Sequence, residues 1–218
     1  MLRSKTGGVF ITLEGGEGAG KSTQLARLSE QLEGAGFPVF QTREPGGTPA
    51  AEALRNLLLF GEESFCWQAE IMLHMAARAD HLAKAIRPAL AEGKIVLCDR
   101  FHDSTWAYQG YGIGEGRAEV LEYIRSLRQV VGGEPDVTLW LDLPCEVARQ
   151  RIYRRGGKLD RYEGQQMQFH QRVRAGFQDI AEKDPVRIRR VDASQSLEEV
   201  QAHLYALVRQ HMAGEGAA

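Results

Sequence analysis

The chain has 218 residues, 43% of them hydrophobic and 26% charged, which are the proportions of an ordinary globular protein with room for one large domain. Its formal net charge of −2 excludes a broad basic surface for nucleic acid but leaves open a local basic cluster for a small anion. No apolar stretch approaches the roughly 18 residues of a membrane helix, and the run VFITL is too short for the apolar part of a signal peptide.

Cys66, Cys98 and Cys145 are odd in number and contain no C-x-x-C spacing, and Cys98 lies inside an apolar run. This pattern is typical of buried free thiols in a reducing compartment rather than of disulfides or a metal site. We therefore expect a cytoplasmic protein that binds neither nucleic acid nor a membrane, folded as a single domain over residues 1–218.

The stretch GGEGAGKST, residues 15–23, matches the phosphate-loop pattern G-x-x-x-x-G-K-[ST] and follows a β-branched run at residues 9–14. Backbone N–H groups and a helix N-terminus bind phosphate in such a loop, while Lys21 reaches the β- and γ-phosphates and the Ser22 hydroxyl binds Mg²⁺. Glu14 is expected to end the strand. The predicted nucleotide-binding residues are Gly15, Gly16, Glu17, Gly18, Ala19, Gly20, Lys21, Ser22 and Thr23.

Five short apolar or β-branched runs alternate with segments of helical periodicity such as residues 196–208. The pattern predicts an α/β fold in which a five-stranded parallel sheet has helices on both faces. Three runs end in aspartate at the edge where ligands bind, and Asp142 and Asp192 are expected to be helix N-caps because helical segments follow them. The predicted strands are residues 9–14, 37–42, 94–99, 137–142 and 188–192.

Two further segments narrow the class of phosphate-loop protein. Residues 43–92 form a helical insertion longer than one crossover needs, and residues 146–163 are basic, with a flexible sequence, RRGGK, inside them. The chain lacks the N-K-x-D stretch typical of guanine specificity and is short for a motor ATPase. A kinase needs an acceptor site and a way to exclude water, and these two segments could provide them.

Four further motifs, in order along the chain, resemble bacterial thymidylate kinases: TREPGGT at 42–48, AARADH at 76–81, LCDRFHDSTWAYQG at 97–110 and LDRYE at 159–163. The resemblance covers nearly the whole chain. It implies a P-loop kinase fold and transfer of the γ-phosphoryl group of MgATP to dTMP, giving dTDP for dTTP synthesis. It also implies a homodimer.

The resemblance assigns roles to residues around the acceptor. Arg43, Arg55 and Arg100 correspond to contacts of the acceptor phosphate, where the planar guanidinium suits phosphate geometry. Asp99 and Glu44 lie near the metal, where a carboxylate can organise Mg²⁺ and its waters. An internal salt bridge of the Arg43–Glu44 pair, and a surface ion pair of Asp99 with Arg100, remain alternatives.

The acceptor base is expected on the helix that contains Arg78, which matches the family arginine that donates to a thymine carbonyl. An ion pair of Arg78 with Asp80 or a neighbouring element is the alternative. Thr105 and Gln109 correspond to positions at the thymine edge, and the Tyr108 ring to one beneath the deoxyribose, where it disfavours a 2′-hydroxyl. His74 departs from the family, which usually has a stacking Phe there; an imidazole stacks with less area and titrates.

Glu17 raises a question, since it places a carboxylate inside an anion-binding loop. Some members of the family carry an arginine in this loop, and others supply it from a closing lid. We therefore predict a lid at about residues 149–163, with Arg155 and Arg161 as catalytic arginines and Arg149 beside the nucleotide; a solvated helix face is the alternative. Glu17 is expected to accept a hydrogen bond from the 3′-hydroxyl of the acceptor sugar.

Two other functions remain open at this stage. A deoxynucleoside kinase shares the phosphate loop and an Asp-Arg motif but would not need three arginines for an acceptor phosphate. A nucleotide-sensing switch would hydrolyse ATP without an acceptor, and Arg78 with Tyr108 argues against it. An ATP-coupled assay across nucleoside monophosphates separates these functions.

Overall fold

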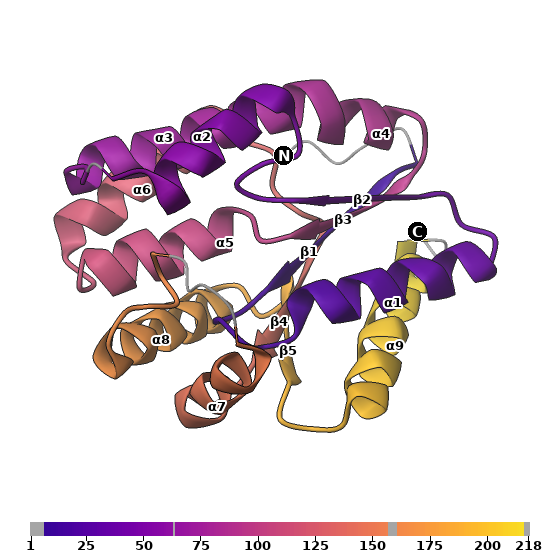
Figure 1. The fold of residues 1–218 in the computed structure, drawn as a ribbon. Coiled ribbons are helices and arrows are strands. Elements are labelled where there is room, and N and C mark those ends of the chain that lie inside the picture. Colours follow the sequence, from indigo (N-terminus) through magenta and orange to yellow (C-terminus); the bar gives the residue numbers. More distant parts are fainter. Residues whose placement is uncertain (1–6, 63, 157–160, 216–218) are drawn as a thin grey trace.

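The computed structural model describes residues 7–62, 64–156 and 161–215, and Figure 1 shows the fold. Within these residues the strands form one parallel sheet in the order β2-β3-β1-β4-β5. This confirms the predicted five-stranded parallel sheet with helices on both faces. The strands are β1 (Val9–Glu14), β2 (Val39–Arg43), β3 (Ile95–Asp99), β4 (Val137–Asp142) and β5 (Ile188–Asp192).

The helices cover the two faces unequally. In Figure 1, α1 and α9 lie on one side, while the layer with α2, α3 and α6 lies on the other. The helical segments are α1 (Lys21–Gly34), α2 (Pro49–Phe60), α3 (Trp67–His81), the π-helical η1 (Leu82–Ile86), α4 (Arg87–Ala91), α5 (His102–Thr105), the π-helical η2 (Trp106–Ile113), α6 (Ala118–Val131), α7 (Cys145–Arg155), α8 (Met167–Lys183) and α9 (Leu197–Glu215). None of them, in the described ranges, is long and apolar enough to cross a membrane.

Strand β1 shows how the sheet separates two cores. Because successive side chains point to opposite faces, Ile11 and Leu13 pack with α1 and α9, whereas Phe10 packs with η1 and α4. A further cluster joins β4 and β5 to α3, η2, α6 and α8. Glu14 falls on the same face as Phe10, and this brings its carboxylate to the carboxyl edge of the sheet on the helical side.

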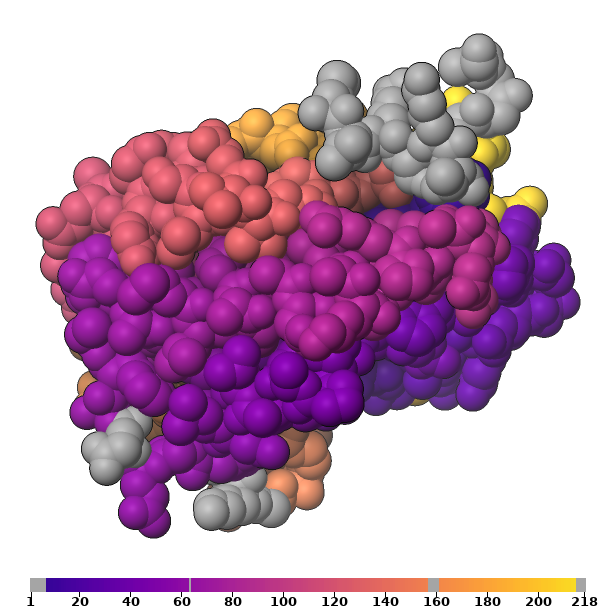
Figure 2. Space-filling view, turned by 90° about the horizontal axis from the view of Figure 1, so that it is seen from above, coloured from indigo at the N-terminus to yellow at the C-terminus, as the bar shows by residue number. Residues whose placement is uncertain are grey.

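The segment between β2 and β3 forms an outer wall of helices. It contains α2, α3, η1 and α4, and Figure 2 looks down on this surface in purple and magenta. Helix α2 begins at an N-cap, Thr48, whose side chain accepts from the Ala51 N–H, with Pro49 in the first turn. The wall places α3 beside η2, the pair that lines the helical end of the cavity described below.

The structure corrects several details. Strand β2 spans Val39–Arg43 instead of residues 37–42, and β3 begins at Ile95 rather than at residue 94. Cys66 is exposed, while Cys98 and Cys145 are buried, and all three are free. The predicted N-caps were wrong.

Buried ion pairs and local turns explain the failure of the cap predictions. Asp142 is 4% exposed and accepts from Arg174 at 2.7 Å, so its charge is neutralised by arginine, and Pro144 precedes α7. Asp192 accepts from Ser194, in a turn before the last helix. That helix is capped by Ser196, which exchanges hydrogen bonds with Glu199 in a capping box.

Candidate active site

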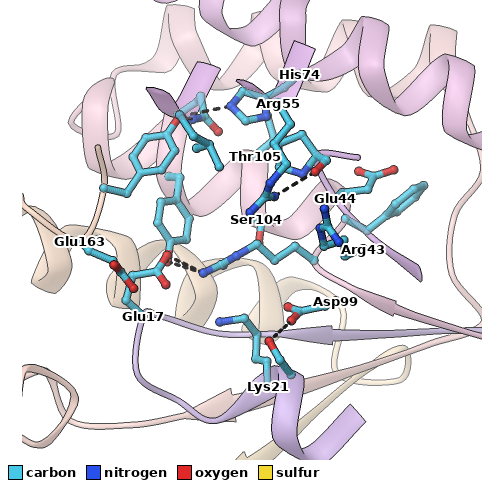
Figure 3. A pocket seen from close by; sticks show the side chains of 18 of the residues that line it. Glu17, Lys21, Arg43, Glu44, Arg55, His74, Asp99, Ser104, Thr105 and Glu163 are labelled. Carbon is cyan, nitrogen blue, oxygen red and sulfur yellow. Dashed lines mark hydrogen bonds and ion pairs between the residues drawn. The ribbon is translucent and has the colours of Figure 1, made fainter. Parts of the chain in front are cut away.

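A cavity of about 370 Å³ opens at the carboxyl edge of the sheet. Figure 3 shows it running from Lys21 and Asp99 at the phosphate-loop end to His74 and Thr105 at the helical end. The position agrees with the rule that ligands bind outside the carboxyl ends of parallel strands. The cavity is lined by every predicted acceptor-site residue: Glu17, Arg43, Glu44, Arg55, His74, Arg78, Arg100, Thr105, Tyr108 and Gln109.

The phosphate loop connects β1 directly to α1. The Lys21 ammonium, on a residue 7% exposed, donates to the carbonyls of Gly15 at 3.1 Å and Gly16 at 2.9 Å. Burial and the charge of Arg100 lower the pKa of Lys21. The lysine is therefore held by its own loop, with the exposed Ser22 and Thr23 following in the first turn of α1.

Gly18 brings this loop against helix α7. Its φ of 71° lies in the left-handed region, and a Cβ there would stand 2.8 Å from the carbonyl oxygen of Ala148. A side chain at this position would collide with backbone. The close approach and the left-handed backbone together account for glycine at this position of the loop.

Asp99 and Ser22 form the site most suited to a metal ion. The Ser22 hydroxyl donates to Asp99 Oδ2 at 2.7 Å. The Asp99 Oδ1 atom is buried and has no hydrogen-bond partner within the described ranges. An orphaned carboxylate oxygen beside a hydroxyl suits Mg²⁺, which takes one or two protein oxygens and completes its shell with water and phosphate. The described residues hold no cluster of three or more His, Cys, Asp or Glu side chains that could bind a metal ion.

Glu44, by contrast, already has partners on both carboxylate oxygens. The residue is 4% exposed; Oε2 accepts from Arg78 Nε at 2.7 Å and Oε1 pairs with His81 Nδ1 at 3.0 Å. These contacts favour a structural carboxylate that orients Arg78 over a direct ligand of the metal.

Arg100 follows β3 in a strained turn. Its φ of 72° is rare for a residue with a side chain, and Glu14 stabilises the turn by accepting from Phe101 N at 2.7 Å and from Ser104 Oγ at 2.5 Å. Burial and the negative charge of Asp103 raise the pKa of Glu14 to about 7. Glu14 ends β1 as expected. Its carboxylate also stabilises the turn at Arg100, the residue that follows β3.

Glu17 has a local counter-charge that the sequence did not reveal. Its Oε1 accepts from Arg100 Nη2 at 2.6 Å and from the Tyr108 hydroxyl at 2.8 Å. Burial alone would raise the pKa of Glu17, but the charges of Arg100 and Lys21 outweigh it and hold the pKa at about 2. The carboxylate in the anion loop is thus offset by Arg100, whose guanidinium also lies over the Tyr108 ring at 4.7 Å.

The other two arginines predicted to bind the acceptor phosphate, Arg43 and Arg55, also line the cavity. Arg43 donates from Nη2 to both oxygens of Glu52 at 2.9 Å, so its salt bridge is with Glu52 rather than with Glu44. Arg55 Nη1 donates to the Pro45 carbonyl at 2.9 Å. Figure 3 shows both arginines at the cavity, as expected for an anion site.

Arg78 is a buried arginine with a dense set of partners. Besides its ion pair with Glu44, it donates from Nη1 to Thr105 Oγ1 at 3.1 Å and from Nη2 to the Phe101 carbonyl at 3.0 Å. The alternative of an ion pair with Asp80 or a neighbouring element is therefore met by the neighbouring element, because Arg78 pairs with Glu44. Asp80 pairs with Lys84 and accepts from Thr48. The arrangement presents Arg78 and Thr105 together at the helical end.

His74 is buried in a polar cluster at the same end. Its Nε2 lies 3.2 Å from the Tyr162 hydroxyl. Burial, followed by the charges of Arg78 and Arg161, lowers the pKa of His74 to about 3. Burial and these charges therefore oppose the titration near neutral pH that the sequence suggested for His74.

The sequence interpretation missed several residues of this cluster and its surroundings. Glu70 precedes His74 by one helical turn and Arg78 by two, so helical periodicity could have revealed it. Tyr162 stands inside the quoted motif LDRYE but was not singled out. The other missed residues that line the cavity or pair with a lining residue are Pro45, Leu59, Phe60, Phe101, Ser104, Glu163 and Glu52.

The predicted lid is partly a regular helix. Arg155, at the end of α7, pairs with Glu163 at 2.7 Å, and both line the cavity. Arg161 pairs with Glu70 at 3.3 Å. Arg149 and Arg154 are exposed on α7 and, in the described part of the chain, are not among the cavity-lining side chains. The predicted tip, RRGGK, spans residues 154–158, and its last two residues lie outside the described residues, as do residues 159 and 160.

Comparison with known proteins identifies the family of the chain. Residues 13–204 match the family model for thymidylate kinase. The chain is 58% identical over 209 residues to the thymidylate kinase of Gluconobacter oxydans, covering 96% of this chain and 98% of that one. It is 50% identical over 204 residues to that of Pseudomonas syringae pathovar tomato, with 92% and 95% covered.

A solved structure supports the same conclusion. The crystal structure of thymidylate kinase from Ehrlichia chaffeensis superposes with a TM-score of 0.75 at 36% identity, covering 93% of this chain and 99% of that one. The sequence match and the fold agree over nearly the full length. The chain therefore belongs to the thymidylate kinase family.

Proposed function

We propose that the chain transfers the γ-phosphoryl group of ATP to dTMP, giving dTDP for dTTP synthesis. The observation that carries the proposal is a single cavity that joins Lys21 and Asp99 to Arg78 and Thr105. A donor nucleotide at the loop and an acceptor nucleotide at the helical end would then meet within one site. Family membership supports the same reaction.

At the donor end, the backbone of residues 15–20 and the Lys21 ammonium would bind the phosphates of ATP. Asp99 and Ser22 would hold Mg²⁺, and their hydrogen bond and the orphaned Asp99 Oδ1 support this assignment. A bound Mg²⁺ would supply positive charge that offsets the negative charge of the donor phosphates. Holding the reactants in line supplies most of the rate, because phosphoryl transfer needs little covalent help.

At the acceptor end, Arg43, Arg55 and Arg100 would bind the dTMP phosphate. Arg100 would exchange one of its present acceptors, Glu17 or Tyr108, for a phosphate oxygen. Glu17, held as a carboxylate by the positive charges around it, would then accept from the 3′-hydroxyl of the sugar.

The proposed base and sugar contacts come from buried residues at the helical end of the cavity. Arg78 and Thr105 would donate to a thymine carbonyl and Gln109 would contact the base edge, with His74 against the ring. The Tyr108 ring would lie beneath the deoxyribose and leave no room for a 2′-hydroxyl. A mismatched base would leave buried polar groups unpaired, which costs about 1–3 kcal/mol per group.

Arg155 is the arginine that we assign to the transferred phosphoryl group. It lines the cavity at the end of α7 and pairs with Glu163, a contact that it could exchange for phosphate oxygens. Arg161 is paired with Glu70 and would affect the site through its charge on that carboxylate. Arg149 would lie beside the bound ATP. We also propose a homodimer in the cytoplasm, on the family resemblance; sedimentation equilibrium would test the dimer.

An ATP-coupled assay across nucleoside monophosphates, with thymidine and an acceptor-free reaction alongside, tests the activity. We expect dTMP to be preferred over dCMP and dGMP by at least about tenfold, with little hydrolysis of ATP alone. Equal turnover of dCMP and dTMP would contradict the acceptor assignment. Faster turnover of thymidine would indicate a nucleoside kinase, and rapid acceptor-free hydrolysis a switch.

A further inference from the structure

We propose that Glu70 is a positioning residue that sets the hydrogen-bonding polarity of the wall facing the acceptor base. Its carboxylate orients the Gln109 amide and, through the Tyr162 hydroxyl, determines which ring nitrogen of His74 carries the proton. The inference rests on the proposed function in one respect, namely that this wall receives the base of the acceptor.

Glu70 is the most deeply buried acidic group of α3. The residue is 1% exposed and lies one turn before His74 on the same helix. Its Oε1 accepts from the Tyr162 hydroxyl at 2.8 Å and from Gln109 Nε2 at 3.1 Å, while Oε2 pairs with Arg161 Nη2 at 3.3 Å. An ion-paired carboxylate accepts hydrogen bonds only, so both Tyr162 and Gln109 must donate to it.

The hydroxyl of Tyr162 then determines the state of His74. A phenol has one hydrogen, and Tyr162 gives it to Glu70. The hydroxyl oxygen accepts from Gln109 Nε2 at 2.9 Å, and because its hydrogen is given to Glu70, the contact with His74 Nε2 at 3.2 Å requires the histidine to donate. A neutral imidazole has one N–H. His74 is therefore the Nε2–H tautomer, and its Nδ1 is an acceptor.

The same reasoning sets the Gln109 amide. Both hydrogens of its Nε2 are directed at Glu70 and Tyr162, so the atom of the amide left for another partner is the carbonyl oxygen. This wall thus has an acceptor on Gln109 and donors on Arg78 and Thr105. Thymine, with an N–H between two carbonyls, complements such a mixed edge, whereas cytosine reverses part of the pattern. Glu70 would thereby support the choice of base without touching it.

The direct test is ¹⁵N NMR of the full-length protein labelled at histidine, recorded near pH 7 without nucleotide. The His74 resonances among the six histidines are identified by their loss in His74→Phe. We expect a protonated Nε2 and an unprotonated Nδ1. Tyr162→Phe, which removes only the hydroxyl, should shift His74 toward the other tautomer. Tyr205→Phe, on α9 at the opposite face, should leave it unchanged.

An Nδ1–H tautomer in the wild-type protein, or no change in Tyr162→Phe, would overturn the proposal. Because this measurement needs no nucleotide, its failure would leave the kinase assignment untouched. Conversely, absence of dTMP phosphorylation by the wild-type protein would overturn the proposed function and leave the tautomer result standing.

Kinetics with the Glu70→Gln variant give the second measurement. We expect KM for dTMP to rise by about tenfold and the preference for dTMP over dCMP to shrink by a similar factor, while KM for ATP stays within about twofold. A merely structural role would raise both KM values together. Equal rises in the two KM values, or an unchanged base preference, would overturn the specificity part of the proposal.

Discussion

The phosphate-loop end of the cavity takes its polar groups mainly from one continuous stretch, residues 15–23, whereas the helical end takes them from separate segments. Lys21 is held by the carbonyls of its own loop. At the helical end, His74, Gln109 and Tyr162 meet from α3, η2 and the segment after residue 160. A local motif therefore specifies the first end, while the second exists only when the chain is folded.

The two ends also differ in how charge is compensated. Glu17 in the loop lines the cavity and is balanced by Arg100, which follows the neighbouring strand β3. Glu70 and Glu44 are each buried and are balanced by Arg161 and Arg78. Because breaking one partner of a buried pair leaves an uncompensated charge, changes at the helical end should affect stability as well as binding.

The largest expected effect comes from removing the positive charge of Lys21 at the phosphate-loop end of the cavity. Lys21→Ala should lower kcat by about 10³-fold or more, since a preorganised charge on the phosphates is lost. The fold should persist, and dTMP binding should change little, because the lysine lies at the other end. Steady-state kinetics with circular dichroism as the folding control check this. A folded variant that keeps more than about a tenth of the activity, a loss below ~1.4 kcal/mol, would contradict the role of Lys21.

The second-largest effect is expected at Arg155, at the end of α7. Arg155→Ala should lower kcat by about 10²- to 10³-fold and raise KM for dTMP much less, because the contact strengthens in the transition state. Arg154→Ala is a matched control, since Arg154 is adjacent on the helix and does not line the cavity. Equal effects of the two variants would show that general basicity of α7, rather than Arg155, matters. Near-normal kcat in a triple variant with Ala at Arg154, Arg155 and Arg161 would contradict the hypothesis that the lid arginines contribute to catalysis.

Gly18→Ala tests the close approach between the loop and α7. A side chain there adds left-handed strain, about 1–2 kcal/mol, to a contact of 2.8 Å with the Ala148 carbonyl. We expect a larger loss of unfolding free energy than in Gly36→Ala, where φ is 87° and the Cβ meets open space. KM for ATP should also rise in Gly18→Ala alone. Chemical denaturation measures the stabilities and steady-state kinetics the KM for ATP. Equal destabilisation by the two substitutions would mean that α7 moves away from the loop and relieves the contact with Ala148.

Glu14→Gln concerns the turn that joins the two ends. The folded pKa of Glu14, about 7, exceeds the ordinary value of 4.5, so the folded state retains a proton that the unfolded state releases between these pH values. Stability of the wild type relative to Glu14→Gln should therefore fall by roughly 1–3 kcal/mol as pH rises from 4.5 to 7 and then level off. Urea unfolding of both proteins across this range measures the difference. A difference independent of pH would mean that Glu14 is ionised in the fold.

The smallest effect is expected from pH at the helical end. Because the folded pKa of His74 is about 3, the ring stays neutral between about pH 5.5 and 7.5. The ratio of dTMP affinities of wild type and His74→Phe should thus stay constant within about twofold over this range. Calorimetric titration at several pH values checks this. A ratio that follows a titration near 6.5 would place a charge on His74 in the folded protein.

Much of the sheet was predictable because each strand is a short apolar run between turn residues. The predicted bounds of β1, β4 and β5 agree with the structure, and β2 and β3 differ by one or two residues at their ends. The caps were not predictable in the same way. Asp142 precedes a helix, but it forms ion pairs with two arginines, Arg174 on α8 and Arg190 on β5. A local pattern cannot report a partner that is distant in sequence.

The sequence by itself determined the phosphate loop, the parallel sheet and the family, because a loop motif and strand periodicity depend on residues that are neighbours along the chain. Tertiary structure alone decided the counter-charge of Glu17, the tautomer of His74 and the partners of Arg78. Arg100 lies 83 residues from Glu17, and Tyr162 lies 88 from His74. Hydrogen bonds and ion pairs act over a few ångströms, so these states arise only when folding brings distant residues together.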